Sequence, residues 1–250
     1  MKTLKIIIYV FIVLILSGCY SQTYYSNLGS NVPLLKEKND FQCYSSVGNS
    51  SGKINEYYGG IAYSMIDQFA ISGNYIYSYN HDEEVFGQSG NYYDIAAGYY
   101  NSFGSLWKIE KPFIYDIYLG YGKDYQHHIY YSRLDIIDSK LKMNKLFVQS
   151  SLGFSTKLID IAFAGRISRL SYCSVEPNMV SGDDLEKLLQ ISSQKNFYRF
   201  EPSFTFQIGW KHIKFREQLF ISYSNKPEII EDMMGINFGF IYLLSNRFKN

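Results

Sequence analysis

Most of this chain consists of runs in which apolar and polar residues alternate, and such alternation places successive side chains on opposite faces of a β-strand. From Phe41 onward the runs are mostly 10 to 13 residues long. That is long for a soluble strand and typical of a tilted strand that crosses a bilayer. We therefore expect an all-β fold: a small antiparallel up-and-down transmembrane β-barrel of about ten strands, with eight to twelve possible. The expected strands cover residues 41–47, 54–66, 69–80, 90–102, 112–122, 145–154, 158–172, 197–209, 212–224 and 234–245.

The connections between these strands alternate in length. Residues 67–68, 155–157 and 210–211 form very short connections, and 103–111 a moderate one. The other connections are long and polar, at 81–89, 123–144, 173–196 and 225–233. Short inner turns and long outer loops are typical of outer-membrane barrels. Within the connection at 173–196, Ser181 and Asp184 form a capping box that predicts a short helix.

Each strand has a richer apolar series, which we assign to the lipid face. Aromatic residues make up 18% of the chain, with 25 Tyr and 18 Phe. A membrane barrel exposes only every second residue to lipid, so the mean hydropathy of −0.17 does not exclude one. The outward series include Phe69, Ile71, Gly73, Tyr75, Tyr77 and Tyr79; Tyr198, Phe200, Pro202, Phe204, Phe206 and Ile208; and Ile236, Phe238, Phe240, Tyr242 and Leu244.

The N-terminus has the pattern of a secretory signal. Lys2 and Lys5 precede an unbroken apolar run at 6–16 that is too short to span a bilayer. Leu16-Ser17-Gly18-Cys19 then resembles the lipobox of bacterial lipoproteins. The resemblance implies cleavage before Cys19, which would carry a covalent diacylglycerol and an N-acyl chain. An ordinary secretory signal with a chance cysteine is the alternative.

We therefore divide the chain into a signal peptide at 1–18, a lipidated tether at 19–39 and a β-barrel domain at 40–250. The tether assignment rests on polar residues, Gly and Pro that follow no period. Tyr20 follows the cysteine and the mature start lacks Asp, so we expect sorting to the outer membrane with the lipid in the inner leaflet. No further cofactor is expected.

The stretch 147–172, together with Asn31-Val32-Pro33-Leu34-Leu35-Lys36-Glu37-Lys38, resembles a family of uncharacterised outer-membrane barrel lipoproteins. The resemblance covers nearly all of the mature chain. Its motifs are structural, so it implies a fold and a location but no activity.

Ionisable residues fall on the inward phase of several expected strands. Charged groups do not sit in a narrow barrel without partners, so we expect opposite charges to pair and plug the pore. A polar ligand site or an ion path is the alternative. The predicted lumen cluster contains Asp94, Asp116, Arg166, Arg199, Glu201 and Arg216.

Other residues receive structural interpretations. We expect His127 and His128 to be exposed loop residues without a metal, and Cys43 and Cys173 to remain unpaired. Tyrosines near strand ends predict an interfacial girdle, with a carbohydrate platform as the alternative. This group comprises Lys53, Tyr57, Tyr58, Tyr92, Tyr93, Tyr99, Tyr100 and Tyr121.

A net charge of +1 shows no basic patch for nucleic acid. No catalytic motif is present, so the first hypothesis is a monomeric, non-enzymatic barrel with a structural or surface-interaction role, in contact with outer-membrane lipid. The second is a lipid-anchored periplasmic barrel that binds an apolar ligand, with the aromatic series facing inward. The third is a lipid-modifying enzyme of the outer membrane.

Overall fold

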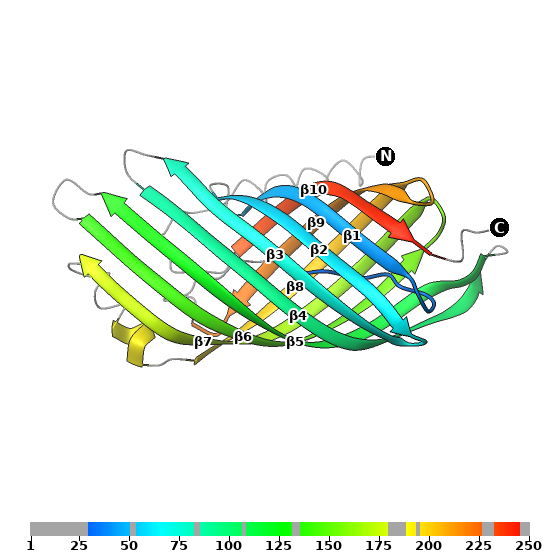
Figure 1. The fold of residues 1–250 in the computed structure, drawn as a ribbon, viewed down its shortest axis with the longest axis horizontal. Helices are drawn as coiled ribbons and strands as arrows, with labels where there is room; N and C mark the ends of the chain where they lie inside the picture. The colour runs from blue at the N-terminus through cyan, green and yellow to red at the C-terminus, as the bar shows by residue number, and fades with distance from the viewer. Residues whose placement is uncertain are drawn as a thin grey trace, which may run out of the picture.

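The computed structural model describes residues 30–50, 54–82, 86–106, 109–131, 136–179, 189–193, 196–226 and 233–245. Within these ranges, ten antiparallel strands form a closed barrel in which β1 pairs with β10 (Figure 1). This confirms the expected fold class. The strands are β1 Phe41–Ser50, β2 Ile54–Ile66, β3 Phe69–Asp82, β4 Phe86–Leu106, β5 Ile109–Tyr131, β6 Ile136–Ser155, β7 Ile159–Met179, β8 Asn196–Gly209, β9 Ile213–Ser224 and β10 Met233–Leu244.

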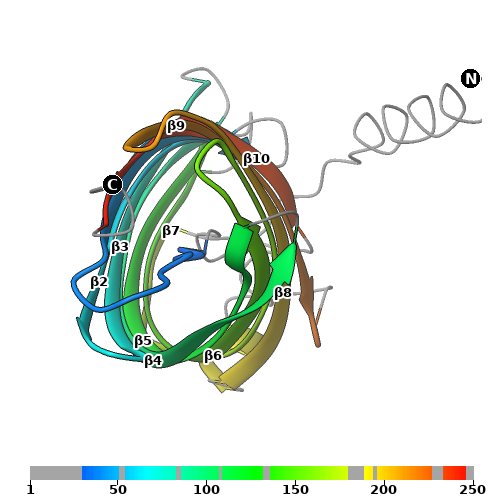
Figure 2. The same ribbon diagram turned by 90° about the vertical axis from the view of Figure 1, so that its right-hand side faces the viewer.

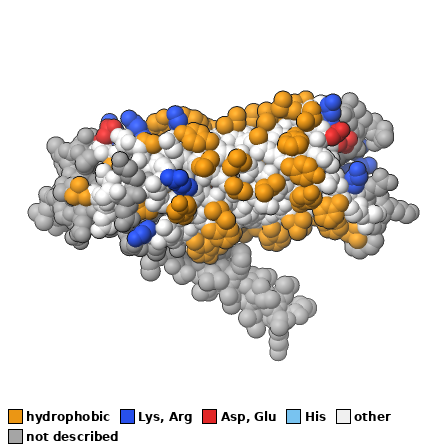
Figure 3. All heavy atoms as spheres, turned by 90° about the horizontal axis from the view of Figure 1, so that it is seen from below, with side chains coloured by type: hydrophobic (Ala, Val, Ile, Leu, Met, Phe, Trp, Pro, Cys, Tyr) orange, Lys and Arg blue, Asp and Glu red, His pale blue; other side chains and the backbone are white. Residues whose placement is uncertain are grey.

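The two faces of the wall differ as the alternation predicts. On β4, Ile95 is 65% exposed on the outer face, whereas the preceding Asp94 is 6% exposed. Hydrophobic side chains form a broad central band on the outside, with charged side chains towards its two ends (Figure 3). An outer surface of this kind is stable in a bilayer, because lipid solvates the apolar band. The structure therefore contradicts an inward-facing aromatic series, on which the apolar-ligand hypothesis depended.

Four neighbouring strands extend well beyond the expected limits. Strands β4 to β7 contain 21, 23, 20 and 21 residues and reach further at one end of the barrel than the other strands (Figure 1). The expected long loops at 123–144 and 173–196 are therefore partly wrong, because β5, β6 and β7 continue as paired strands through much of them. The connections expected at 81–89 and 103–111 are shortened in the same way.

The physical reason is that the outer face of these extensions carries few apolar side chains. Outward Lys123, Lys142 and Arg169 mark the end of the apolar band on β5, β6 and β7. Beyond them, backbone pairing continues without an apolar series to reveal it. The expected capping residues Ser181 and Asp184 lie outside the described residues, which include a helical turn at 189–193. No helix in the described ranges is long and apolar enough to cross a membrane.

The N-terminal segment differs from the expected tether. Residues 30–35 are buried, and the segment leading into β1 runs inside the ring of strands (Figure 2). The described part of the expected tether at 19–39 is therefore integral to the barrel domain, which begins before residue 40. The apolar side chains of Val32, Leu34 and Leu35, each at most 2% exposed, explain why this segment is inside.

The expected tyrosine girdle divides between the two faces. Tyr57 and Tyr93 are about half exposed, but their neighbours Tyr58 and Tyr92 are buried. Adjacent residues on a strand must point to opposite faces, so a girdle that includes both members of each pair is wrong. Tyr100 is buried in the same way, Tyr121 is exposed and Lys53 lies outside the described residues.

The two adjacent histidines follow the same rule. Both lie on β5 rather than in a loop. His128 is 4% exposed, whereas His127 is partly exposed and its Nε2 lies 2.9 Å from Asp138 Oδ1. The expectation that both are exposed loop residues is therefore wrong.

Candidate functional site

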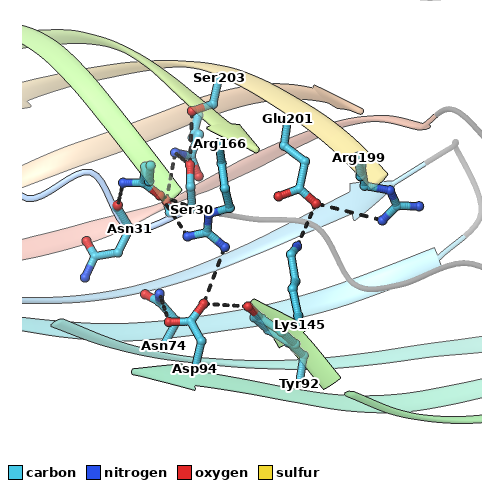
Figure 4. Close-up of polar contacts among 12 residues, drawn as sticks. Ser30, Asn31, Asn74, Tyr92, Asp94, Lys145, Arg166, Arg199, Glu201 and Ser203 are labelled. Atoms are coloured by element: carbon cyan, nitrogen blue, oxygen red, sulfur yellow. Dashed lines mark hydrogen bonds and ion pairs between the residues drawn. The ribbon is translucent and has the colours of Figure 1, made fainter. Parts of the chain in front are cut away.

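The barrel lumen is the candidate site. The structure places all six residues of the predicted lumen cluster inside the barrel, each at most 7% exposed. Five different strands supply them: β4, β5, β7, β8 and β9. Figure 4 shows four of them with their polar neighbours.

Arg166 and Asp94 form one ion pair across the lumen. The guanidinium Nη1 lies 3.4 Å from Asp94 Oδ2, and both side chains are almost completely buried. The same carboxylate accepts hydrogen bonds from Tyr92 Oη (2.7 Å) and Asn74 Nδ2 (2.6 Å). The extra donors matter because a buried ion pair is stable only when its remaining hydrogen-bonding capacity is also satisfied.

Glu201 forms the second ionic centre. Lys145 Nζ donates to Glu201 Oε1 at 2.6 Å, and Arg199 Nη1 lies 3.9 Å from the same oxygen (Figure 4). Lys145 was absent from the predicted cluster. Its inward phase on β6, between outward Asn144 and Leu146, is the sequence feature that could have identified it.

Arg216 and Asp116 do not join these pairs. Among the described residues, neither has an ion-pair partner within 4.0 Å. A shared inward phase on neighbouring strands does not by itself bring Arg216 to Arg199 and Glu201. The β8–β9 register instead places Gln207 opposite Arg216, six positions along β8 from Glu201.

The N-terminal segment contributes polar contacts at the same level of the lumen. The carbonyl oxygen of Ser30 accepts hydrogen bonds from Gln218 Nε2 (3.0 Å) and Arg216 Nη2 (3.4 Å). The carbonyl of Asn31 accepts one from Gln149 Nε2 at 2.6 Å. In addition, the Ser30 hydroxyl lies 3.0 Å from that of Ser203 (Figure 4). These bonds connect the segment to β6, β8 and β9.

The apolar residues of the segment fit between small inward side chains. Leu35 packs in a cluster with Ala62, Ala70 and Ala96, which lie on β2, β3 and β4. Val32 and Leu34 pack in another with Ile114, Ala162 and Ala164. A Cβ at Gly153 would collide with Leu34. Alanine and glycine at these positions therefore leave the space that the segment fills.

Further bonds hold the segment near the end of the barrel where β1 begins. Lys36 Nζ donates to the carbonyl of Ser155 at 2.6 Å, and Ser102 Oγ donates to the carbonyl of Lys36 at 3.4 Å. Lys214 and Asp160 form a buried ion pair of 2.7 Å at the same end. We name residues 30–36 the plug segment. The plug segment contacts strands on all sides of the lumen.

The other end of the lumen has an apolar cluster. Inward side chains of β6, β7 and β8 pack there against Ile191 of the helical turn. The cluster consists of Leu141, Met143, Leu170, Tyr172, Ile191 and Phe197. The lumen thus contains ion pairs in its middle and apolar contacts on either side of them.

The metal-ligating side chains of the described ranges do not gather into a cluster. No group of three or more His, Cys, Asp or Glu side chains there could hold a metal ion. Cys43 and Cys173 are both free thiols, as we expected. Cys19 lies outside the described residues.

Comparisons with known proteins identify no family. No family model matches the chain, and no curated protein matches it in sequence. The resemblance to uncharacterised barrel lipoproteins therefore stays a prediction.

Several solved structures are similar to the chain in fold. A structure entitled KdgM porin has 11% identity and a TM-score of 0.37, covering 82% of this chain and 99% of its own. The outer membrane protease OmpT from Escherichia coli has 8% identity and a TM-score of 0.43, covering 85% and 99%. The translocator domain of the autotransporter NalP from Neisseria meningitidis has 8% identity and a TM-score of 0.40, covering 82% and 87%.

Proposed function

We propose that this protein is a lipid-anchored outer-membrane barrel with a closed lumen, and that it has a structural or surface-interaction role without catalysis. The observation that carries this proposal is the plug segment. It is buried in the lumen and hydrogen-bonded to several strands, where an open channel would hold water.

The paired charges support the same conclusion. A water-filled pore would leave its charged side chains partly exposed, but Lys145, Arg166 and Glu201 are each at most 7% exposed. The N-terminal signal and the lipobox at Cys19 support export and acylation. The extended hairpins of β4 to β7 would then project from the outer surface, where a partner could bind them.

Planar bilayer recordings test the closed lumen. The folded wild-type protein, identified by its faster migration on gels without heating, should give no steady conductance at about 50 mV. Boiled protein is the control for contaminating channels. Steady channels from the folded wild type, at a frequency proportional to the protein added, would contradict the proposal.

A further inference from the structure

Arg216 is a buried guanidinium that has no acidic partner among the described residues. It is 2% exposed, and the described residues place no carboxylate within 4.0 Å of it. Its hydrogen bonds go to two neutral oxygens, the Ser30 carbonyl and Asn237 Oδ1, both at 3.4 Å. Its remaining face lies over the Tyr44 ring, 4.2 Å from the ring centre. A buried cation normally has a counter-ion, so this site has the chemistry to take an anion.

The plug segment presents carbonyl oxygens where an anion would bind. Gln218 and Arg216 both donate to the Ser30 carbonyl, and Gln149 donates to the Asn31 carbonyl. Gln149 in turn accepts hydrogen bonds from Arg166 Nε and Nη2, at 3.0 and 2.8 Å. Arg216 therefore donates directly to the Ser30 carbonyl. Arg166 donates to the Gln149 side chain, which in turn donates to the Asn31 carbonyl.

Among the described residues, the plug segment takes no part in the strand pairing of the barrel, and it continues into β1 through residues 37–40. Its apolar contacts are with alanines and other side chains of the wall, and no disulfide involves the described cysteines. Displacement of this segment would therefore require no change in the strand pairing of the barrel.

We propose that Arg216, Gln218 and the Arg166–Gln149 pair form an anion-selective constriction, which the plug segment closes by placing the Ser30 and Asn31 carbonyls on it. Withdrawal of the plug segment exposes the donors, and small anions such as chloride pass more readily than potassium. This inference rests on the proposed function, in which the lumen is closed. It adds the conducting state that forms when the plug segment leaves the lumen.

The first test expels the plug segment from the full-length protein. The double variant Leu34→Asp with Leu35→Asp places two carboxylates in apolar clusters, whereas Leu34→Met with Leu35→Met is the matched control. The aspartate variant should conduct in planar bilayers, and the methionine variant should stay closed. In a tenfold KCl gradient the reversal potential should show chloride permeating at least about threefold faster than potassium.

Removal of the unpaired cation tests the selectivity. Adding Arg216→Gln to the aspartate variant should move the chloride-to-potassium permeability ratio towards one. Lys142→Gln, which removes a half-exposed lysine on the outer face of β6, should leave the ratio unchanged. Channels that are nonselective or cation-selective before Arg216 is replaced would overturn the inference.

A second test does not depend on the folding of the aspartate variant. Ser30→Cys with Ser203→Cys, in a background with Cys43→Ser and Cys173→Ser, places two thiols where the hydroxyl oxygens are 3.0 Å apart. Reduced protein should open transiently at high voltage with the same anion preference, and oxidised protein should not open. Openings that persist after oxidation would show that the plug segment is not the gate.

The two proposals fail in different ways. Steady channels from the wild type would contradict the closed lumen itself. A closed wild type, together with folded plug variants that never conduct, would leave the closed lumen intact and overturn the anion path.

Discussion

At the scale of the residue, the lumen shows how a narrow barrel holds charge. Lys145 and Glu201 are both buried, and their 2.6 Å contact is supplemented by Arg199 at 3.9 Å. Such a pair adds little net stability by itself, but removing one partner leaves the other charge desolvated. The consequence differs from that of an exposed pair such as Lys142 and Glu176, which water already solvates.

Lys145→Met should therefore destabilise the barrel by about 3–5 kcal/mol. The matched control is Lys142→Met, which breaks an exposed pair and should cost less than about 1 kcal/mol. Urea unfolding in lipid vesicles, followed by the migration of unheated samples, measures both. Adding Glu201→Gln to Lys145→Met should recover part of the loss, and equal losses for the two lysine variants would show that the lumen is hydrated.

His128 adds a dependence on pH at the outer end of β5, beyond the apolar band. Burial lowers the pKa of His128 to about 3, with a smaller contribution from His127. In the unfolded chain the pKa of His128 is near 6.5. Between about pH 3 and about pH 6.5, the unfolded state therefore binds a proton that the folded state does not bind. Stability is complete above about pH 6.5 and is lost as the pH falls, by about 2 kcal/mol at about pH 5.

Hydrogen exchange of the β5–β6 hairpin, corrected for intrinsic rates, measures this effect. Exchange should accelerate on going from about pH 7 to about pH 5 in the wild type. His128→Asn, which cannot titrate in this range, should show a much smaller change. A wild type that is as well protected at the lower pH would contradict the buried neutral state of His128.

At the scale of the element, the strands divide into two groups. Strands β4 to β7 extend past the apolar band at one end, whereas β1, β9 and β10 contain only 10 to 12 residues. The rim at that end is therefore higher on the β4–β7 side. The 156–158 turn lies at the opposite end, and Thr156 closes it by accepting hydrogen bonds from the Leu158 and Ile159 amides.

Epitope tags test the orientation of these elements in cells. A tag between β5 and β6 should be cleaved by protease added to intact cells, because the extended hairpin projects outward. A tag in the 156–158 turn should be cleaved only after the outer membrane is permeabilised. The reverse pattern would place the barrel upside down in the membrane.

The alternation of residues was sufficient to predict the barrel, since the inward or outward phase of a strand depends only on local periodicity. The phase of β8, from Tyr198 to Ile208, agrees with the structure throughout. The periodicity of one strand does not determine its register with the next strand. It therefore could not predict that Arg216 and Glu201 lie apart. It also could not detect the plug segment, where Val32, Leu34 and Leu35 follow no period and fill space that distant alanines leave.

At the scale of the whole molecule, the anchor remains a prediction from sequence. The lipobox offers the Cys19 thiol as its acylation point. Cys19→Ser should abolish labelling with radioactive palmitate and stall processing of the signal peptide. Cys43→Ser and Cys173→Ser are the matched controls and should label normally. Unchanged labelling of the Cys19 variant would contradict lipid anchoring.

The position of the plug segment also imposes an order on assembly. Its contacts are with strands that span the chain from Ile61 on β2 to Gln218 on β9, so they join residues up to 188 positions apart. The β1–β10 seam closes the same wall. Contacts of such high sequence separation form slowly, because loop-closure entropy must be overcome first. The plug segment can therefore complete its contacts only when the wall around it is complete, which makes the last step of folding also the step that seals the lumen.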